Sequence, residues 1–244
     1  MNRIKLLIAI IVIFFSVSQS ISQIKYSIGP FIGVTIPTGD YSGTTIDYYE
    51  GIHYGLSSGI DIGALLKIKL PVLAIRISAG YSPLKNTGVA VIDHPDSYIE
   101  VKQSLFTISA GPEFQFNIPQ SPIKPYAGID LLLTSFSGET TFINVPKVDP
   151  GTFSMSSTTR IGLGLGVGSE FGLGKKYSLD LGLRYNIHNL FGKTITSSDS
   201  RVTSYLYLND QADPLYPIDP NHHPILSNRS ISTLNIYLAF LFNL

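Results

Sequence analysis

The sequence predicts an all-β protein, an eight-stranded antiparallel up-and-down transmembrane β-barrel. Three observations lead to this prediction. Eight segments alternate between apolar and small or polar residues with a period of two, the charged residues within them share the polar face, and the connections between them alternate between short and long. These are the sequence features of a sheet that closes on itself in a bilayer, with one face toward lipid and the other toward a narrow interior.

The alternation is clearest from Arg160 to Phe171, where glycine occupies positions 162, 164, 166 and 168. Successive side chains of a strand point to opposite sides, so the glycines share one face and the apolar residues share the other. The apolar faces of the first four expected strands are Tyr26, Ile28, Ile32, Val34 and Ile36; Leu56, Ile60, Ile62, Ala64, Leu66 and Ile68; Leu73, Ile75, Ile77, Ala79 and Tyr81; and Phe106, Ile108, Ala110, Phe114 and Phe116. Phe31 is an exception in the first of these strands.

The second half of the chain repeats the pattern. The apolar faces of the other four expected strands are Pro125, Ala127, Ile129, Leu131 and Leu133; Ile161, Leu163, Leu165, Val167 and Phe171; Tyr177, Leu179, Leu181, Leu183, Tyr185 and Ile187; and Leu234, Ile236, Leu238, Phe240 and Phe242. An even number of strands returns the chain to the side on which it started and lets the sheet close without free edges, as a bilayer requires.

The charged residues of these segments lie on the glycine face. A charge on the lipid face near the middle of a bilayer costs about 2 to 4 kcal/mol for Arg or Lys, so this face is predicted to line the lumen. Lys67 shares this face in the second segment. The predicted luminal charge network consists of Asp61, Arg76, Glu113, Asp130, Arg160, Glu170, Asp180 and Arg184.

The connections alternate in length. Short turns are expected near residues 69–72, 117–123 and 172–176, and long polar segments near 37–54, 83–102, 137–158 and 190–230. Short periplasmic turns and long external loops are typical of outer-membrane barrels. The pattern therefore places both ends of the mature chain in the periplasm.

The first residues indicate export. Arg3 and Lys5 precede an apolar run from Leu6 to Phe15, and small polar residues follow, as in a secretory signal peptide. We expect cleavage after Ser22, which leaves residues 1–22 as the signal peptide and 23–244 as one barrel domain. The run is shorter than the roughly 20 apolar residues that a membrane-spanning helix needs. The chain has no cysteine, which excludes disulfides and lipid attachment to an N-terminal Cys.

Composition excludes some partners and leaves one alternative fold. Charged residues make up only 14% of the chain, as suits a body surrounded by lipid, and the 17 basic and 17 acidic residues give no basic surface for nucleic acid. The alternative is a soluble eight-stranded barrel of the lipocalin kind, with the apolar face lining a ligand cavity. The polar face of mostly Gly and Ser argues against it. So do the aromatic residues near strand ends, which suit a membrane interface: Tyr26, Tyr81, Phe116, Tyr177, Tyr185 and Phe242.

The chain resembles the small outer-membrane β-barrel families of Gram-negative bacteria, in particular the PorT-like and OmpX/OmpA-like barrels. The resemblance rests on the signal peptide, the start of the fifth strand at 124–128, the glycine strand at 162–168, the strand at 181–185 and the apolar closing strand. It implies a location in the outer membrane and insertion by the barrel assembly machinery. That machinery recognises a final strand ending in an aromatic residue, whereas this chain ends in Leu244, with Phe240 and Phe242 on the same face.

The predicted lumen has two interpretations. An eight-stranded barrel is just wide enough for side chains to fill, and buried charges must pair. The favoured interpretation is a lumen plugged by ion pairs, and the alternative is a narrow channel for small polar solutes or ions.

The histidines leave room for an enzyme or a metal site, although neither is favoured. The five are His53, His94, His188, His222 and His223, in or beside the long connections. A hydrolase at the external rim would pair His94, His188 or His222 with a nearby acid, but no catalytic spacing is present. The segment from Asp219 to His223 gathers oxygen and nitrogen ligands, yet a turn explains it equally well. We therefore predict no enzyme activity, no metal and no cofactor.

The last connection is the best candidate for contact with a partner. It is long, and beyond about 12 to 15 residues such a loop is often functional. It contains Tyr205, Tyr207 and Tyr216, and tyrosine offers contact area at a low entropic cost. Residues 201–209 alternate and are expected to extend the last two strands as a hairpin. The predicted function is a structural or interaction role at the cell envelope, with a narrow channel or a secretion-accessory role of PorT type as alternatives.

Overall fold

The computed structural model describes residues 24–70, 73–116, 118–196, 205–212, 214 and 227–244, so the expected signal peptide lies outside the described residues. No helix in these ranges is long and apolar enough to cross a membrane. The elements are β1 (Lys25–Thr38), η2 (Gly39–Tyr41), α2 (Thr45–Glu50), β2 (Gly59–Lys69), β3 (Leu73–Val91), β4 (His94–Gln115), β5 (Ile123–Ile143), β6 (Gly151–Gly172), β7 (Tyr177–Phe191), β8 (Tyr205–Leu206) and β9 (Ser232–Asn243).

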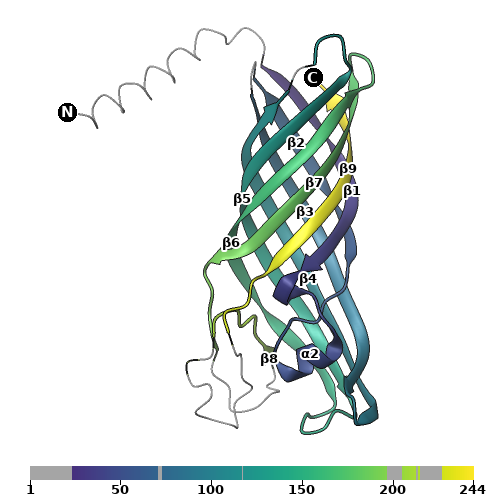
Figure 1. The fold of residues 1–244 in the computed structure, drawn as a ribbon, viewed down its shortest axis with the longest axis vertical. Coiled ribbons are helices and arrows are strands. Elements are labelled where there is room, and N and C mark those ends of the chain that lie inside the picture. Colours follow the sequence, from purple (N-terminus) through teal and green to yellow (C-terminus); the bar gives the residue numbers. More distant parts are fainter. Residues whose placement is uncertain (1–23, 71–72, 117, 197–204, 213, 215–226) are drawn as a thin grey trace, which may run out of the picture.

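The strands form a closed barrel (Figure 1). β1 to β7 and β9 each pair antiparallel with the next strand, the β5–β6 pairing completes the sheet, and β9 pairs with β1. The Leu244 amide donates to the Tyr26 carbonyl at 2.8 Å, which joins the two ends of the ring. The predicted eight-stranded up-and-down barrel is confirmed.

The two ends of the barrel differ. The chain terminus and the short turns lie at one end, whereas α2, β8 and the long connections lie at the other (Figure 1). By the rule that short turns are periplasmic, we expect the end with α2 to face the outside of the cell. The outer surface of the middle part is apolar, with Ile32 and Leu165 each 60% exposed, as a lipid-facing wall requires.

Two segments expected to be long loops are strands instead. β3 and β4 stay paired from Leu73↔Phe114 to Val91↔His94, so residues 83–102 form a hairpin rather than an external loop. β5 and β6 likewise pair as far as Phe142↔Gly151. The prediction was wrong here because it required apolar residues on the outer face of every strand, a condition that applies only inside the membrane.

The burial pattern of these long strands inverts beyond the membrane. Between Leu73 and Tyr81, β3 places its apolar side chains outward. The length of this segment is close to the roughly 9 to 11 residues that a tilted strand needs to cross a bilayer. Further out, Leu84 and Ala90 are buried inside while Lys85 and Thr87 face outward. Water surrounds this part, so the hydrophobic effect now favours apolar residues inside.

An apolar core fills the external part of the barrel. We call this part the external module: the outer halves of β3 to β6, together with residues 39–56, 205–212 and 227–231. Its core consists of Tyr41, Tyr54, Leu56, Leu84, Ala90, Ile99, Val101, Leu105, Phe136, Phe142, Val145, Met155, Leu208 and Ile231. Leu56 was expected at the start of the second strand, but β2 begins at Gly59 and Leu56 packs in this core.

The first connection supplies a short helix to the module. Thr44 caps α2 by accepting a hydrogen bond from the Asp47 amide at 3.1 Å, and the Asp47 carboxylate accepts one from the Thr44 amide at 2.7 Å, which forms a capping box. Gly51, in the left-handed conformation with φ 77°, ends the helix. Thr45 then donates to the Val89 carbonyl at 2.7 Å, so α2 lies against β3.

The expected hairpin extension in the last connection is absent from the described residues. Tyr205 and Leu206 form β8, which pairs parallel with Ser154 and Met155 of β6 instead of extending β7 and β9. Residues 201–204 lie outside the described residues. β6 has a free side there because β7 ends at Phe191, and strand edges favour pairing with any available segment.

Candidate functional site

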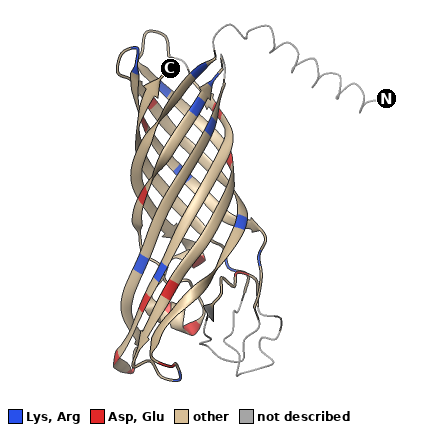
Figure 2. Cartoon of the chain, turned by 180° about the vertical axis from the view of Figure 1, so that it is seen from behind, with Lys and Arg blue, Asp and Glu red and all other residues tan. Residues whose placement is uncertain are grey.

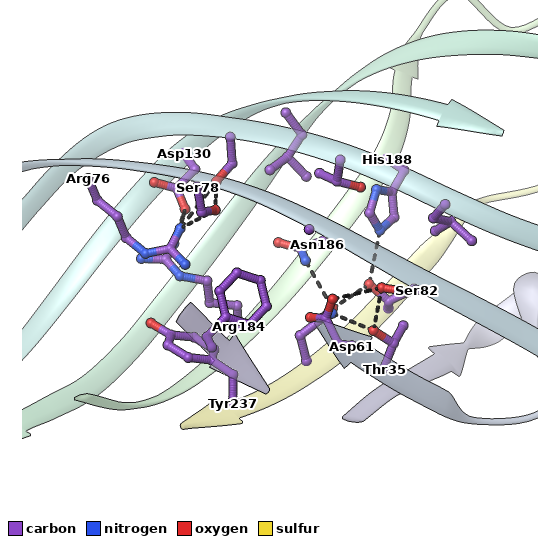
Figure 3. A pocket seen from close by; sticks show the side chains of 18 residues that line it. Thr35, Asp61, Arg76, Ser78, Ser82, Asp130, Arg184, Asn186, His188 and Tyr237 are labelled. Atoms are coloured by element: carbon purple, nitrogen blue, oxygen red, sulfur yellow. Dashed lines mark hydrogen bonds and ion pairs between the residues drawn. The ribbon is translucent and has the colours of Figure 1, made fainter. Parts of the chain in front are cut away.

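The structure places all eight residues of the predicted luminal charge network on the inner face of the barrel. Each of them is at most 7% exposed. They divide by height into an inner cluster near the periplasmic end, a middle cluster, and Arg160 near the external mouth. Figure 3 shows the middle cluster with Arg76, Asp130 and Arg184 together, and Asp61 with Ser82 further along the lumen.

The inner cluster surrounds Lys67. Its Nζ lies 2.7 Å from Glu113 Oε1 and 3.8 Å from Glu170 Oε2, and it also contacts Asp180. Lys69 forms a second ion pair with Glu170. Lys67 and Glu113 are fully buried, and such charges are tolerated in an interior only when they are paired.

A pair of tyrosines lies above the inner cluster. The Tyr126 hydroxyl donates to Asp180 Oδ1 at 2.5 Å, and the Tyr126 and Tyr237 hydroxyl oxygens lie 2.9 Å apart. The Lys67 ammonium lies 4.2 Å from the centre of the Tyr126 ring. These side chains extend across the lumen from β5, β9 and β2 and fill its cross-section.

The middle cluster shares one carboxylate between two arginines. Arg76 Nη1 lies 3.2 Å from Asp130 Oδ2, and Arg184 contacts the same oxygen. Arg76 also donates to the hydroxyls of Ser78 and Ser109, each at 3.2 Å. The three charged groups come from β3, β5 and β7, so they tie together strands on different sides of the ring.

The luminal glycines make room for the large side chains. A Cβ at Gly166 would lie 2.8 Å from Arg184 Cγ, and one at Gly168 would overlap the Tyr126 hydroxyl. A Cβ at Gly182 would overlap the Tyr237 ring. The glycine strand therefore leaves space for the groups that plug the lumen, as the expectation of a crowded interior requires.

The external mouth is closed by Asp210, which the sequence analysis did not single out. Its carboxylate is fully buried and accepts hydrogen bonds from Arg160 Nε at 3.1 Å, Arg160 Nη2 at 3.0 Å and Asn189 Nδ2 at 2.7 Å. The Thr194 amide donates a further bond at 3.0 Å. These bonds draw residues 205–212 of the last connection onto the end of the lumen.

Arg229 completes the closure from the other side of the same connection. Its guanidinium donates to the Asn209 carbonyl at 2.6 Å and lies 4.2 Å from the centre of the Tyr54 ring. The Tyr54 hydroxyl donates to the same carbonyl at 3.1 Å. The first and last connections therefore meet over the lumen, in a cluster that we call the mouth cluster: Tyr54, Arg160, Asn189, Asn209, Asp210 and Arg229.

The predicted network left out several charged groups of the lumen and its mouth. The predicted network has more acids than bases, and the structure adds Lys67, Lys69, Arg229 and Asp210 to it. Lys67 was already on the glycine face, so its position was readable from the alternation. Asp210 and Arg229 lie in a connection without alternation, where no sequence pattern points inward.

The described histidines lie in different parts of the barrel, with His94 at the start of β4, His188 in β7 and His53 after α2. His188 lies in the lumen rather than at an open rim, with Nδ1 2.8 Å from the Thr134 hydroxyl and Nε2 2.9 Å from the Thr233 hydroxyl. His53 Nδ1 lies 3.9 Å from Asp47. No three His, Asp or Glu residues of the described ranges gather as metal ligands. His222 and His223, with the segment from Asp219, lie outside the described residues.

Two features of the external module shift pKa values. The Thr44 amide and hydroxyl, which donate to the Asp47 carboxylate, lower the pKa of that carboxyl, with a smaller contribution from His53. Burial raises the pKa of the Tyr41 hydroxyl, which donates to Gln103 Oε1 at 3.0 Å. At neutral pH the Asp47 carboxyl is therefore ionised and accepts these hydrogen bonds, whereas the Tyr41 hydroxyl is protonated and donates its own.

Of the three tyrosines predicted for partner binding, Tyr207 is 44% exposed on the external module. Tyr205 belongs to β8, and Tyr216 lies outside the described residues. The exposed tyrosine lies just before the buried Leu208 and Asp210, so the closed mouth fixes its position.

The family comparison agrees with this geometry. The family model described as outer membrane protein beta-barrel domain matches residues 6–207. The chain belongs to this family. As a member of the outer membrane protein beta-barrel family, it is located in the outer membrane of a Gram-negative bacterium and contacts its lipid. The family description names no reaction, and the narrower resemblance to PorT-like barrels stays a prediction.

Several solved barrels are similar to this family member. Neisserial surface protein A is 16% identical with a TM-score of 0.47, covering 90% of this chain and 96% of that one. OprG from Pseudomonas aeruginosa is 10% identical with a TM-score of 0.49, covering 90% and 95%. Ail of Yersinia pestis, solved with the heparin analogue sucrose octasulfate, is 12% identical with a TM-score of 0.41, covering 91% and 99%. No curated protein sequence matches the chain.

Proposed function

We propose that this outer-membrane barrel is a closed, non-conducting surface protein whose external module is a rigid platform for contact with an envelope or extracellular partner. The observation that carries the proposal is the inverted burial of β3 to β6. A pore does not need an apolar core above the membrane, whereas a protruding recognition module does. The luminal ion pairs and the mouth cluster support the same conclusion, because their buried side chains obstruct the lumen near the periplasmic end, in the middle and at the external mouth.

Conductance in a planar bilayer tests the closed lumen. The folded barrel, identified by its shift on an unheated gel, should insert without producing discrete current steps, because Lys67 in the inner cluster and Asp210 at the external mouth are fully buried. Reproducible steps from the unmodified protein would contradict the proposal and support a narrow channel. A control preparation of a known porin in the same bilayer shows that insertion is detected.

Single-cysteine labelling tests the orientation and exposure of the platform, since the chain contains no cysteine of its own. A membrane-impermeant thiol reagent should label Tyr207→Cys and Thr87→Cys on intact cells. It should label Lys175→Cys, in the short turn between β6 and β7, only after the outer membrane is permeabilised. The reverse pattern would place the platform in the periplasm.

We also propose that the barrel assembly machinery recognises the last strand through its outward face. Phe240, Phe242 and Leu244 are all exposed to the outside, and the Phe240 and Tyr177 rings stack with centres 5.6 Å apart. Phe242→Ser should lower the amount of folded protein in the outer membrane. Phe114→Ser, at a similarly exposed position on β4, is the control, and an equal loss in both variants would contradict the role of the last strand.

A further inference from the structure

A cavity of about 50 Å³ lies inside the lumen, between the middle cluster and His188. Polar and apolar atoms share its walls, and Figure 3 shows Arg76, Asp130 and Arg184 at one side with Asp61, Ser82 and Thr35 at the other. A water molecule needs roughly 10 to 15 Å³ of such volume, so about three to five fit. The luminal plug therefore contains a space large enough for a small group of ligand atoms.

Several atoms on the cavity walls have no hydrogen-bond partner among the described residues. These atoms are Asp130 Oδ1, Asn186 Oδ1, Arg76 Nε, Arg184 Nε and Arg184 Nη2. Their residues are 1%, 8%, 3% and 4% exposed. A buried polar group without a partner costs roughly 1 to 3 kcal/mol and more when it is charged, so such groups are normally satisfied by a protein atom or by ordered water.

The chemistry of these atoms selects the ligand. Arg184 offers donors, whereas Asp130 and Asn186 offer acceptors, so the ligand must both donate and accept hydrogen bonds. A small anion would meet the carboxylates of Asp130 and Asp61, and a small cation would meet two guanidinium groups. Water satisfies both kinds of group, and it adds no charge to a site whose arginines and acids already balance.

We propose that the cavity is a hydration site that holds a cluster of about three to five ordered water molecules bridging Arg184, Asp130 and Asn186. The proposal goes beyond the surface role and does not depend on it. Side chains lie above and below the cluster. The tyrosine pair Tyr126 and Tyr237 lies below it, and the hydrogen bonds of His188 to Thr134 and Thr233 lie above it. The waters complete the middle cluster without opening a path through the barrel.

A crystal structure of the folded barrel at a resolution that shows ordered water tests the proposal. Density peaks are expected at about 2.7 to 3.2 Å from Asn186 Oδ1 and from Arg184 Nη2, with contacts to both donors and acceptors. A cavity without density would overturn the proposal. A single strong peak that contacts only the arginines would also overturn it, because that geometry indicates an anion.

A variant whose larger side chain fills the cavity, compared with a matched control, provides a second test. Leu132→Phe enlarges a buried side chain on the cavity wall and should remove the water density, whereas Leu131→Phe, the neighbour exposed to lipid, should keep it. If Leu132→Phe does not fold, water cross-relaxation by NMR on the unmodified barrel takes its place. Cross-peaks to water are expected for the Asn186 and Asn235 side-chain amides, and their absence would refute the site.

Discussion

Asp210→Ala should open the external mouth without unfolding the barrel. The carboxylate is fully buried and is the ionic partner of Arg160, which is itself only 3% exposed. Removing one partner of a buried pair costs about 3 to 5 kcal/mol, because the other charge stays buried without compensation. The affected bonds join residues 205–212 to Arg160 of β6, to the end of β7 and to Thr194, so the loss acts on closure of the mouth.

The increase in the population with an open mouth follows from the free energy lost with the buried pair. At about 1.4 kcal/mol per tenfold change, the open population should rise roughly a hundredfold to a few thousandfold. Limited proteolysis of the folded barrel measures this population when closing is faster than cleavage. The cleavage rate in the last connection should rise accordingly, while the gel shift of the folded barrel stays. Asp149→Ala, an exposed acid between β5 and β6, is the control.

A double variant tests the physical reason. Replacing both partners of a buried pair by apolar residues of similar size is often neutral or stabilising, so Asp210→Leu with Arg160→Met should be cleaved more slowly than Asp210→Ala. An unchanged cleavage rate in Asp210→Ala would refute the closing role of the pair. A double variant cleaved faster than Asp210→Ala would refute the argument from uncompensated charge.

Three further predictions concern the lumen, the lipid face and α2. Gly168→Ala places a Cβ against the Tyr126 hydroxyl and the Leu181 carbonyl oxygen. Overpacking of this kind costs about 1 to 3 kcal/mol, so the urea midpoint of unfolding should fall. Gly172→Ala on the same strand is the control and should leave the midpoint unchanged, because the nearest atom to its Cβ is 3.6 Å away. Leu165→Arg puts a charge in the middle of the apolar band and should lower the free energy of unfolding by about 2 to 4 kcal/mol in a folding titration in lipid. Thr87→Arg on the external module should change this free energy little. Equal effects of the two variants would contradict the assigned membrane span. The pKa of Asp47 is lowered in the folded protein, so its contribution to α2 is present above its ordinary pKa and is lost as the pH falls through the lowered value. The protection of the amides in residues 45–50, measured against their intrinsic exchange rates at each pH, should therefore fall at acid pH in the native chain, and an Asp47→Asn variant without this pH dependence would identify the group.

The sequence by itself determined the transmembrane part of the protein. The period-two pattern assigned the lipid face and the luminal charges, because a bilayer excludes charge from one side of every strand and each position can be judged without its neighbours. The same pattern failed above the membrane. There water replaces lipid, so apolar residues occupy the inner face of the barrel instead of the outer one. In β4 this change occurs between Leu105 and Phe106, and in the sequence these two adjacent apolar residues mark it.

Only the tertiary structure decided which groups meet inside the barrel. Asp130 contacts Arg76 and Arg184 because the register of the sheet brings β3, β5 and β7 to the same height, and register is a property of the closed ring rather than of any strand. Asp210 reaches Arg160 through a connection that has no repeating pattern. Pairing across the lumen depends on positions in space, whereas alternation along a strand depends only on the order of residues, so the sequence showed the faces and the structure showed the contacts.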